Sequence, residues 1–273
     1  MRRLPTLSTH SLFAAALAAT LAGCAISTQQ EVELGTNYAS QINNQLPLVT
    51  DPEIVRYINL LGDSIAELSD ERNLDWHFYV VDSREVNAFA VPGGFIYVNR
   101  GLIERTTKMS QLAGVLGHEI GHVIERHSVK QMQKAQGANM GLTLACVLTR
   151  VCESGVTQAA VQVGGGALFA SFSRSDEAEA DQVGIEYVTR AGIDPRGIPE
   201  MFRILIRERD NQPSGGIDAW FRTHPMEEDR VAATERAIAR IPAATLNRLT
   251  QDSPRYQTIK RRLTALPAPR AAR

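Results

Sequence analysis

Two stretches of the chain carry apolar residues at every third or fourth position, a spacing that places them on one side of an α-helix. The first begins at Asp51-Pro52-Glu53, where the aspartate suits a helix N-cap and the proline suits the first helical turn. Its apolar positions are Ile54, Ile58, Leu61, Ile65 and Leu68. The second runs from Ser110, a candidate N-cap, to His127. Its apolar positions are Leu112, Val115, Leu116, Val123 and Ile124. Each pattern predicts a helix with one buried face.

Three shorter runs between these helices predict a sheet. Residues 76–81 are aromatic and β-branched and predict a strand in which His77 is partly exposed. Two further runs, 87–91 and 95–98, are joined by Pro92-Gly93-Gly94, a strong turn signal. We therefore expect an α+β, mostly α fold with a small antiparallel sheet beside the second helix.

The strand that contains Asn87, Ala88, Phe89 and Ala90 is a candidate substrate-binding strand. It leads into Pro92, and proline is tolerated at a sheet edge better than in a central strand. An edge strand offers unpaired backbone groups to which an extended peptide can add itself. An ordinary hairpin without a binding role is the alternative.

The C-terminal half contains another informative helix. Ser175 is a candidate N-cap, Asp176 and Glu177 follow in the first turn, and Gly192 suits the residue just past the C-terminal end. Two Gly- and Ala-rich apolar segments, 138–151 and 156–172, precede it. Neither reaches the roughly 18 charge-free residues of a membrane span, so we expect buried helices there.

Composition adds the domain organisation and excludes one class of partner. With 273 residues, 44% of them hydrophobic, the chain can bury a core as one domain with appendages. We expect a signal peptide at 1–23, a linker and peripheral segment at 24–50, one main folded domain at 51–245, and a peripheral element with a disordered tail at 246–273. The net charge of −1 provides no electrostatic basis for binding nucleic acid.

The N-terminus has the features of a targeting segment. Met1-Arg2-Arg3 is basic, and the apolar run 12–22 is too short for a permanent span. Leu21-Ala22-Gly23-Cys24 then resembles the lipobox of bacterial lipoproteins. The resemblance implies cleavage before Cys24, lipidation of that cysteine with palmitate among its acyl chains, and, because Ala25 follows, sorting to the periplasmic face of the outer membrane. A plain secretory signal is the alternative.

Two cysteines remain in the mature chain, Cys146 and Cys152. A disulfide between them is compatible with an oxidising compartment. Whether they are close enough to pair stays open, because sequence does not give the distance between their Cα atoms.

The candidate chemistry lies on the helix 110–127. His118, Glu119 and His122 form an H-E-x-x-H motif, which on a helix places both imidazoles on one face, one turn apart. Two such imidazoles can bind one Zn²⁺, and Glu119, beside them, can accept a proton from water. Glycines at 114, 117 and 121 border this face, which predicts close approach by another helix. His127, five residues past His122, points elsewhere on a continuous helix, and we interpret it as a cap or a core hydrogen-bonding residue.

Two later segments supply the remaining polar residues of a metal site. Glu177 and Asp181 are four residues apart and share a helix face, whereas Glu179 points about 200° away. A glutamate from a second helix is the third protein ligand that a His-His-Glu site requires. His224 and Arg230 are candidates for binding the oxyanion of a tetrahedral intermediate. His224 alternatively occupies the open position of the metal, or caps a helix.

Four motifs in order, NAFAVPGG, HEIGHVIERH, SRSDEAEAD and THPMEEDR, carry a resemblance to a known family. They resemble motifs of the HtpX and CaaX-prenyl-protease type of zinc metallopeptidase, in particular its periplasmic lipoprotein branch, which includes LoiP and BepA. The resemblance covers about residues 50 to 240 and implies a gluzincin-like domain. It also implies one Zn²⁺ per chain, bound by His118, His122 and Glu177.

The same resemblance implies that Glu119 is the catalytic base, that Asp181 donates a proton or orients a ligand, and that His224 lies near the open coordination position. The expected function is a zinc endopeptidase of the bacterial envelope that hydrolyses unfolded or misassembled envelope proteins as quality control. Its partners would be such polypeptides and the membrane that holds the lipid anchor. Two alternatives remain, a client-holding chaperone or assembly factor that uses the same groove, and a latent protease gated by His224.

Overall fold

The computed structural model describes residues 26–135, 171–211, 218–225 and 228–268. The elements up to the motif helix are α2 (Thr28–Gln45), α3 (Pro52–Ala66), β1 (His77–Val81), β2 (Ala88–Val91), β3 (Phe95–Asn99), α4 (Arg100–Arg105) and α5 (Met109–Ile124). Those that follow are α9 (Arg174–Arg190), α10 (Gly197–Asn211), α11 (Asp218–Thr223), α12 (Glu228–Ile238), α13 (Ala243–Leu246) and α14 (Pro254–Thr264). The fold is mostly helical, as expected, with one small sheet.

Several predictions fall outside the described residues. These are the signal peptide with Cys24, the pair Cys146 and Cys152, and nearly all of the two apolar segments 138–151 and 156–172. Lipidation, the disulfide and the buried helices therefore stay predictions. Within the described ranges, no helix has both the length and the apolar character that crossing a membrane requires.

The sheet is mixed, so the prediction of an antiparallel sheet was only partly right. Its strand order is β1-β3-β2, with β2 antiparallel to β3 and β1 parallel to β3. The Pro-Gly-Gly turn makes the β2–β3 hairpin as predicted, and Gly93 and Gly94 adopt φ angles of 84° and 102° that favour glycine. The parallel pairing of β1 with β3 was not readable from the sequence. Residues 82–87 carry the chain from β1 at one edge of the sheet to β2 at the other edge, and β3 then returns between them.

The central strand β3 is buried on both faces. Ile96 and Val98 belong to the main hydrophobic core, whereas Phe95 and Tyr97 pack with Ala39 of α2 in a second cluster. The alternation follows from the two-residue period of a strand. Helix α2, in the segment 24–50, thus covers the sheet face opposite the main core.

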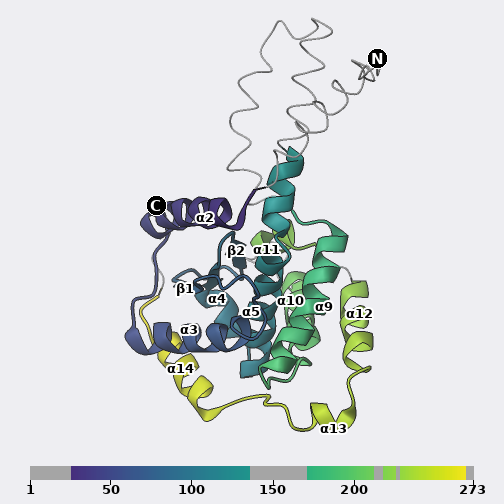
Figure 1. Cartoon of the computed structure of the whole chain (residues 1–273). Coiled ribbons are helices and arrows are strands. Elements are labelled where there is room, and N and C mark those ends of the chain that lie inside the picture. Colours follow the sequence, from purple (N-terminus) through teal and green to yellow (C-terminus); the bar gives the residue numbers. More distant parts are fainter. Residues whose placement is uncertain (1–25, 136–170, 212–217, 226–227, 269–273) are drawn as a thin grey trace, which may run out of the picture.

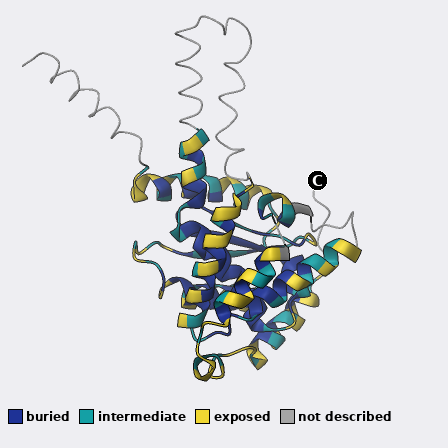
Figure 2. Ribbon diagram, turned by 90° about the vertical axis from the view of Figure 1, so that its right-hand side faces the viewer, coloured by how far each residue is buried: buried dark blue, intermediate teal, exposed yellow. Residues whose placement is uncertain are grey.

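Helix α5 is central to the molecule, with the sheet and α3 to one side and α9 and α10 to the other (Figure 1). Its first fifteen residues, from Met109 to Val123, are all buried. Figure 2 shows the same arrangement as dark blue inner elements surrounded by helices with yellow outer faces. A helix so placed can present polar side chains only to other protein groups, so its histidines must find partners there.

The last helix, α14, is part of the main core. Residues 246–273 were expected to be peripheral, but Tyr256, Ile259 and Leu263 of α14 are buried in the main core. Tyr256 hydrogen-bonds through its hydroxyl to Thr106, just before α5. The apolar residues of this helix were too few and too widely spaced among charges to mark a core helix.

Three local predictions also need correction. Helix α5 begins at Met109 after Lys108, so Ser110 is not its N-cap. The N-cap of α9 is Ser173 rather than Ser175, because Ser173 and Asp176 form a reciprocal capping box. Leu68 is 54% exposed, since α3 ends at Ala66.

Candidate metal centre

Close packing of α5 against α9 brings the predicted ligands together. A Cβ atom on Gly117 would lie 2.8 Å from Val188 Cγ1, and one on Gly184 would lie 3.2 Å from the backbone nitrogen of His118. The glycines therefore allow the two backbones to approach more closely than larger residues would. This confirms that the glycines of the motif helix face another helix, and it places His118 and His122 opposite Glu177.

Four buried side chains converge at this interface: His118, His122, Glu177 and His224. The Nε2 atoms of His118 and His122 are 3.0 Å apart. Glu177 lies 3.5 Å from His118 Nε2 through Oε2, and 3.4 Å from His122 Nε2 through Oε1. His224 Nδ1 is 3.0 Å from Glu177 Oε1 and 3.4 Å from His118 Nε2.

These separations fit a small cation. Ligand atoms held tetrahedrally at about 2.0–2.2 Å from a metal are about 3.3–3.6 Å from one another. The two histidines also have their other ring nitrogens engaged, because His118 Nδ1 is 2.9 Å from Asp181 Oδ1 and His122 Nδ1 is 2.9 Å from His127 Nδ1. Their Nε2 lone pairs are thus left to face each other, an arrangement that favours a cation between them.

The electrostatics of the cluster also favour positive charge. Burial lowers the pKa of His118, but the carboxylates of Asp181 and Glu177 raise it by more, to about 9. Burial raises the pKa of Glu177, yet His224, His118 and His122 hold that pKa well below its usual value. Burial holds the pKa of His122 well below its usual value, so its imidazole is neutral. A neutral imidazole and an ionised carboxylate are the forms that bind a metal.

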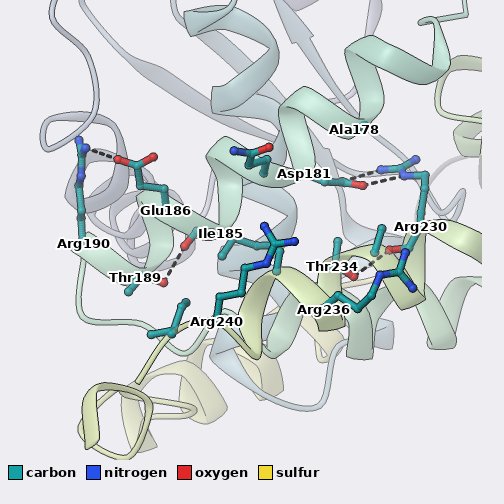
Figure 3. Close-up of a pocket in the computed structure, with 14 residues that line it drawn as sticks. Ala178, Asp181, Ile185, Glu186, Thr189, Arg190, Arg230, Thr234, Arg236 and Arg240 are labelled. Carbon is teal, nitrogen blue, oxygen red and sulfur yellow. Dashed lines mark hydrogen bonds and ion pairs between the residues drawn. The ribbon is translucent and has the colours of Figure 1, made fainter. Parts of the chain in front are cut away.

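Asp181 lies beside His118 and behind the cluster. Its carboxylate accepts two hydrogen bonds from Arg230, from Nε at 2.8 Å and from Nη2 at 2.7 Å, as Figure 3 shows. Burial raises the pKa of Asp181, but Arg230 lowers it by more, so the group is ionised. Of the two predicted roles, proton donor or orienting residue, this geometry favours the second.

Arg230 is placed differently from its predicted role. Besides Asp181, its Nη1 contacts Glu177 Oε2 at 2.5 Å and the carbonyl oxygen of Pro225 at 3.1 Å. Its side chain is only 10% exposed. Because its donors are already used by buried acceptors, the arrangement favours a residue that fixes two carboxylates over one that contacts substrate.

Glu119 is completely buried beside the ligands. Neither of its carboxylate oxygens accepts a hydrogen bond from the residues that the structure describes, although His224 Nε2 is 3.5 Å from Oε1. Burial raises the pKa of Glu119. A buried carboxylate with free acceptor oxygens and a raised pKa has the properties of a general base.

His224 covers the cluster from a third element. It follows α11, its ring stacks on Trp220 at a centroid distance of 4.5 Å, and it is 1% exposed. With His224 in this position the cluster has four ligand atoms within 4.8 Å of one another and no exposed side chain. The described residues thus leave the cluster buried, with His224 as one of the side chains that cover it.

The candidate substrate strand lies at the sheet edge, as predicted. Within the described residues β2 pairs only with β3, and it packs against α5. Ala88 and Ala90 are buried, whereas Asn87 and Phe89 are half-buried. The location agrees with the prediction, and peptide binding by this strand stays a prediction.

A groove lies between α9 and α12 (Figure 3), whereas the metal cluster lies between α9 and α5. Its volume is about 630 Å³, and Asp181 and Arg230 form part of its wall. The same ion pair therefore borders both the groove and the metal cluster.

Two contacts of the site were missed by reasoning from the sequence. His127 is fully buried, with its Nδ1 atom against His122, and its Nε2 atom is 3.1 Å from Glu179 Oε2. A continuous helix would have pointed His127 away from His122. The sequence signal for this turn is the polar pair Arg126-His127 at the end of the motif, where the apolar pattern stops.

The model of peptidase family M48 matches residues 53–238 of the chain. The chain belongs to peptidase family M48. The match includes all four converging residues, and it confirms the resemblance drawn from the four motifs. The relationship also accounts for a mostly helical domain with a small sheet beside the motif helix.

Relatives with this domain are found in bacteria and mitochondria. The chain is 32% identical over 223 residues to the beta-barrel assembly-enhancing protease of Escherichia coli O157:H7, covering 78% of this chain and 45% of that protein. It is 32% identical over 237 residues to the protein of the same name from Yersinia pestis, covering 83% and 48%. It is 28% identical over 212 residues to the mitochondrial metalloendopeptidase OMA1 of Danio rerio, covering 74% and 44%. The chain thus spans somewhat less than half the length of these relatives.

Proposed function

We propose that this M48 family member is a zinc endopeptidase of the bacterial envelope that cleaves unfolded or misassembled envelope proteins. The observation that carries the proposal is the convergence of His118, His122 and Glu177 from two helices. Beside them lies the buried Glu119, whose carboxylate accepts no hydrogen bond from the described residues. The relatives named as proteases and metalloendopeptidases support the activity. The lipobox-like Cys24 and the name of the bacterial relatives support the location and the substrate class.

His118, His122 and Glu177 would hold the metal. Zn²⁺ suits two imidazoles and a carboxylate, and when bound it would acidify a water molecule and polarise the peptide carbonyl. Asp181 fixes the ring of His118, and Arg230 holds Asp181 and Glu177 in place. The ligands are thus oriented before substrate arrives.

Glu119 would move the proton. Its carboxylate oxygens can take a proton from the attacking water, hold it because burial raises the pKa of Glu119, and then give it to the amine nitrogen as the C–N bond breaks. His224 Nε2, 3.5 Å from Glu119, is placed to donate a hydrogen bond to the oxyanion after a small displacement. The substrate would extend along β2, an edge strand that pairs only with β3 among the described residues, by adding its backbone to the sheet.

The experiment compares wild type with Glu119→Gln, with unfolded casein as the test substrate. We expect cleavage by wild type, loss of cleavage on chelation, and at least about a 100-fold lower rate for Glu119→Gln. Zinc content by elemental analysis should stay at one per chain in both proteins, because Glu119 is not a ligand. A Glu119→Gln protein that cleaves casein at the wild-type rate would overturn the proposal.

A latent form of the same enzyme is the second candidate. It is favoured by the burial of every member of the cluster and by the contact of His224 with Glu177. In this case His224→Ala should raise the rate of casein cleavage above wild type. If His224 only stabilises the oxyanion, the same variant should be slower than wild type.

A further inference from the structure

The chain turns sharply where the motif helix ends. Helix α5 ends at Ile124, and Arg126 has a φ angle of 58°, in the left-handed region that a non-glycine residue seldom adopts. Residues 127–135 then form another helical segment. On an uninterrupted helix His127 would lie about 140° around the axis from His122. The turn at Arg126 instead brings the ring of His127 beside the ring of His122, with their centroids 4.9 Å apart.

His127 connects a predicted metal ligand to a carboxylate. Its Nδ1 atom is 2.9 Å from His122 Nδ1, and its Nε2 atom is 3.1 Å from Glu179 Oε2. His127 is fully buried, whereas the side chain of Glu179 is 48% exposed. The chain of contacts therefore runs from the buried cluster to the surface of α9.

Only one arrangement of protons satisfies all these contacts. A metal-binding Nε2 atom of His122 carries no proton, so the proton of that neutral ring is on Nδ1. That N–H must donate to Nδ1 of His127, which accordingly has its own proton on Nε2. The Nε2–H of His127 then donates to Glu179, whose carboxylate can only accept.

We propose that His127 and Glu179 are positioning residues that fix the ring orientation and tautomer of His122 for metal binding. The inference rests on the proposed metal site. His118 has a direct counterpart in Asp181, 2.9 Å from its Nδ1 atom. Glu179 faces away from Glu177 on α9 and cannot reach His122 itself, so the imidazole of His127 spans the gap. Phe172 stacks on the face of the His122 ring, with centroids 4.0 Å apart, and offers no hydrogen bond to the ring edge.

The test measures zinc affinity of the full chain by competition with a chromophoric chelator. We expect His127→Leu to weaken zinc binding by about 10- to 100-fold, the usual effect of losing the partner of a metal-binding histidine. His127→Asn keeps an acceptor near the position of Nδ1 and should recover most of this loss. Glu179→Ala should weaken zinc binding by about 10-fold, the lower end of that range. Its side chain is half-exposed, so water can replace the carboxylate as the hydrogen-bond acceptor of His127.

Two controls separate positioning from a structural role. Glu186→Ala removes an exposed glutamate from the same helix, and its zinc affinity should equal that of wild type. The thermal midpoint of each variant without zinc reports fold stability alone. If His127→Leu and Glu179→Ala lower that midpoint but bind zinc within about twofold of wild type, the proposal is wrong.

The outcomes also distinguish this inference from the proposed function. If wild type itself binds no zinc, the metal site fails and this inference fails with it. If wild type binds zinc tightly and both variants do as well, only the positioning role fails. Should His127→Leu not fold, the affinities of His127→Asn and Glu179→Ala decide the question.

Discussion

Arg230 is the residue on which two carboxylates of the centre depend. Asp181 and Glu177 are almost fully buried, and both contact its guanidinium. Burying a carboxylate costs free energy because the group loses its water. If its cationic partner is removed, that desolvation cost remains and the attraction that offset it is lost. The motif THPMEEDR marked Arg230 as a site residue, but only the folded chain gives its partners.

Arg230→Met should therefore destabilise the protein strongly. We expect a loss of about 3–5 kcal/mol in the free energy of unfolding, because both carboxylates remain buried but lose the guanidinium that neutralises them. Urea denaturation of zinc-free protein near neutral pH measures it without a contribution from metal binding. The matched control is Arg203→Met, which breaks the exposed ion pair with Glu235 and should cost at most about 1 kcal/mol. Equal losses for both variants would contradict the prediction.

Asp194, far from the cluster in the connection between α9 and α10, sets a pH dependence. Its carboxylate accepts hydrogen bonds from the backbone N–H of Arg196 at 3.0 Å and from its Nε at 2.9 Å. Burial raises the pKa of Asp194, but these bonds lower it by more, to below the ordinary 3.8. The folded state thus binds this proton less readily than the unfolded state, so the stabilisation is complete above 3.8 and is lost as the pH falls through the folded pKa.

Asp194→Asn should remove that dependence. We expect wild type to be more stable by about 1 kcal/mol near neutral pH, a modest value because Arg196 is partly exposed, with the difference shrinking below about pH 4. Urea titrations at a series of pH values measure the difference. Asp210→Asn, at an exposed position of α10, should follow wild type throughout. A gap that stays constant down to about pH 3 would show that Asp194 acts without its charge.

At the scale of elements, the contact between α5 and α9 determines whether there is a site. Three of the four converging side chains come from these two helices, so the distance between the helix axes sets the size of the cluster. Gly184 lies where the two backbones approach closely, because a Cβ atom added to it would be 3.2 Å from the backbone nitrogen of His118. The glycines of α5 were recognisable in the sequence, whereas their counterpart Gly184 was not.

Gly184→Val should separate the two helices. We expect a loss of about 1–3 kcal/mol in stability, the usual cost of overpacking, and weaker zinc binding, because Glu177 moves away from the histidines. Chelator competition and urea denaturation measure the two effects. Gln182→Val puts the same residue at an exposed position of α9, and its zinc affinity should equal that of wild type. Unchanged zinc affinity in Gly184→Val would show that the helix spacing is not limiting.

At the scale of the whole molecule, a bound metal would join elements that are distant in sequence. His118 and His122 lie on α5, Glu177 on α9, and His224 after α11. A ligand that binds only the folded state stabilises it in proportion to the logarithm of its concentration over its dissociation constant.

Removal of zinc should therefore lower the thermal midpoint of the whole domain. At a free zinc concentration 1,000 times the dissociation constant, the stabilisation lost is about 4 kcal/mol. Calorimetry with and without a chelator measures it. In Glu177→Gln, which lacks the ligand carboxylate, the chelator should have a smaller effect. If the chelator lowers the thermal midpoints of wild type and Glu177→Gln equally, its effect does not come from this metal centre.

Sequence alone was sufficient where the determining geometry is local. The two imidazoles of H-E-x-x-H share a helix face because residues four apart always do, and the Pro-Gly-Gly turn dictates its own hairpin. The same local rules gave the helices α3, α5 and α9, and the four motifs in order gave the family that the comparison confirmed. The convergence of the proposed ligands was inferable because a His-His-Glu site requires a glutamate from a second helix.

Tertiary structure decided whatever depends on contacts between distant segments. The parallel pairing of β1 with β3, the burial of α14, the partners of Arg230 and the approach of His127 to His122 all follow from packing. None has a periodic signal, since each joins residues whose local patterns permit several arrangements of similar energy. Burial in one shared core selects among those arrangements, and it also encloses the centre beneath His224.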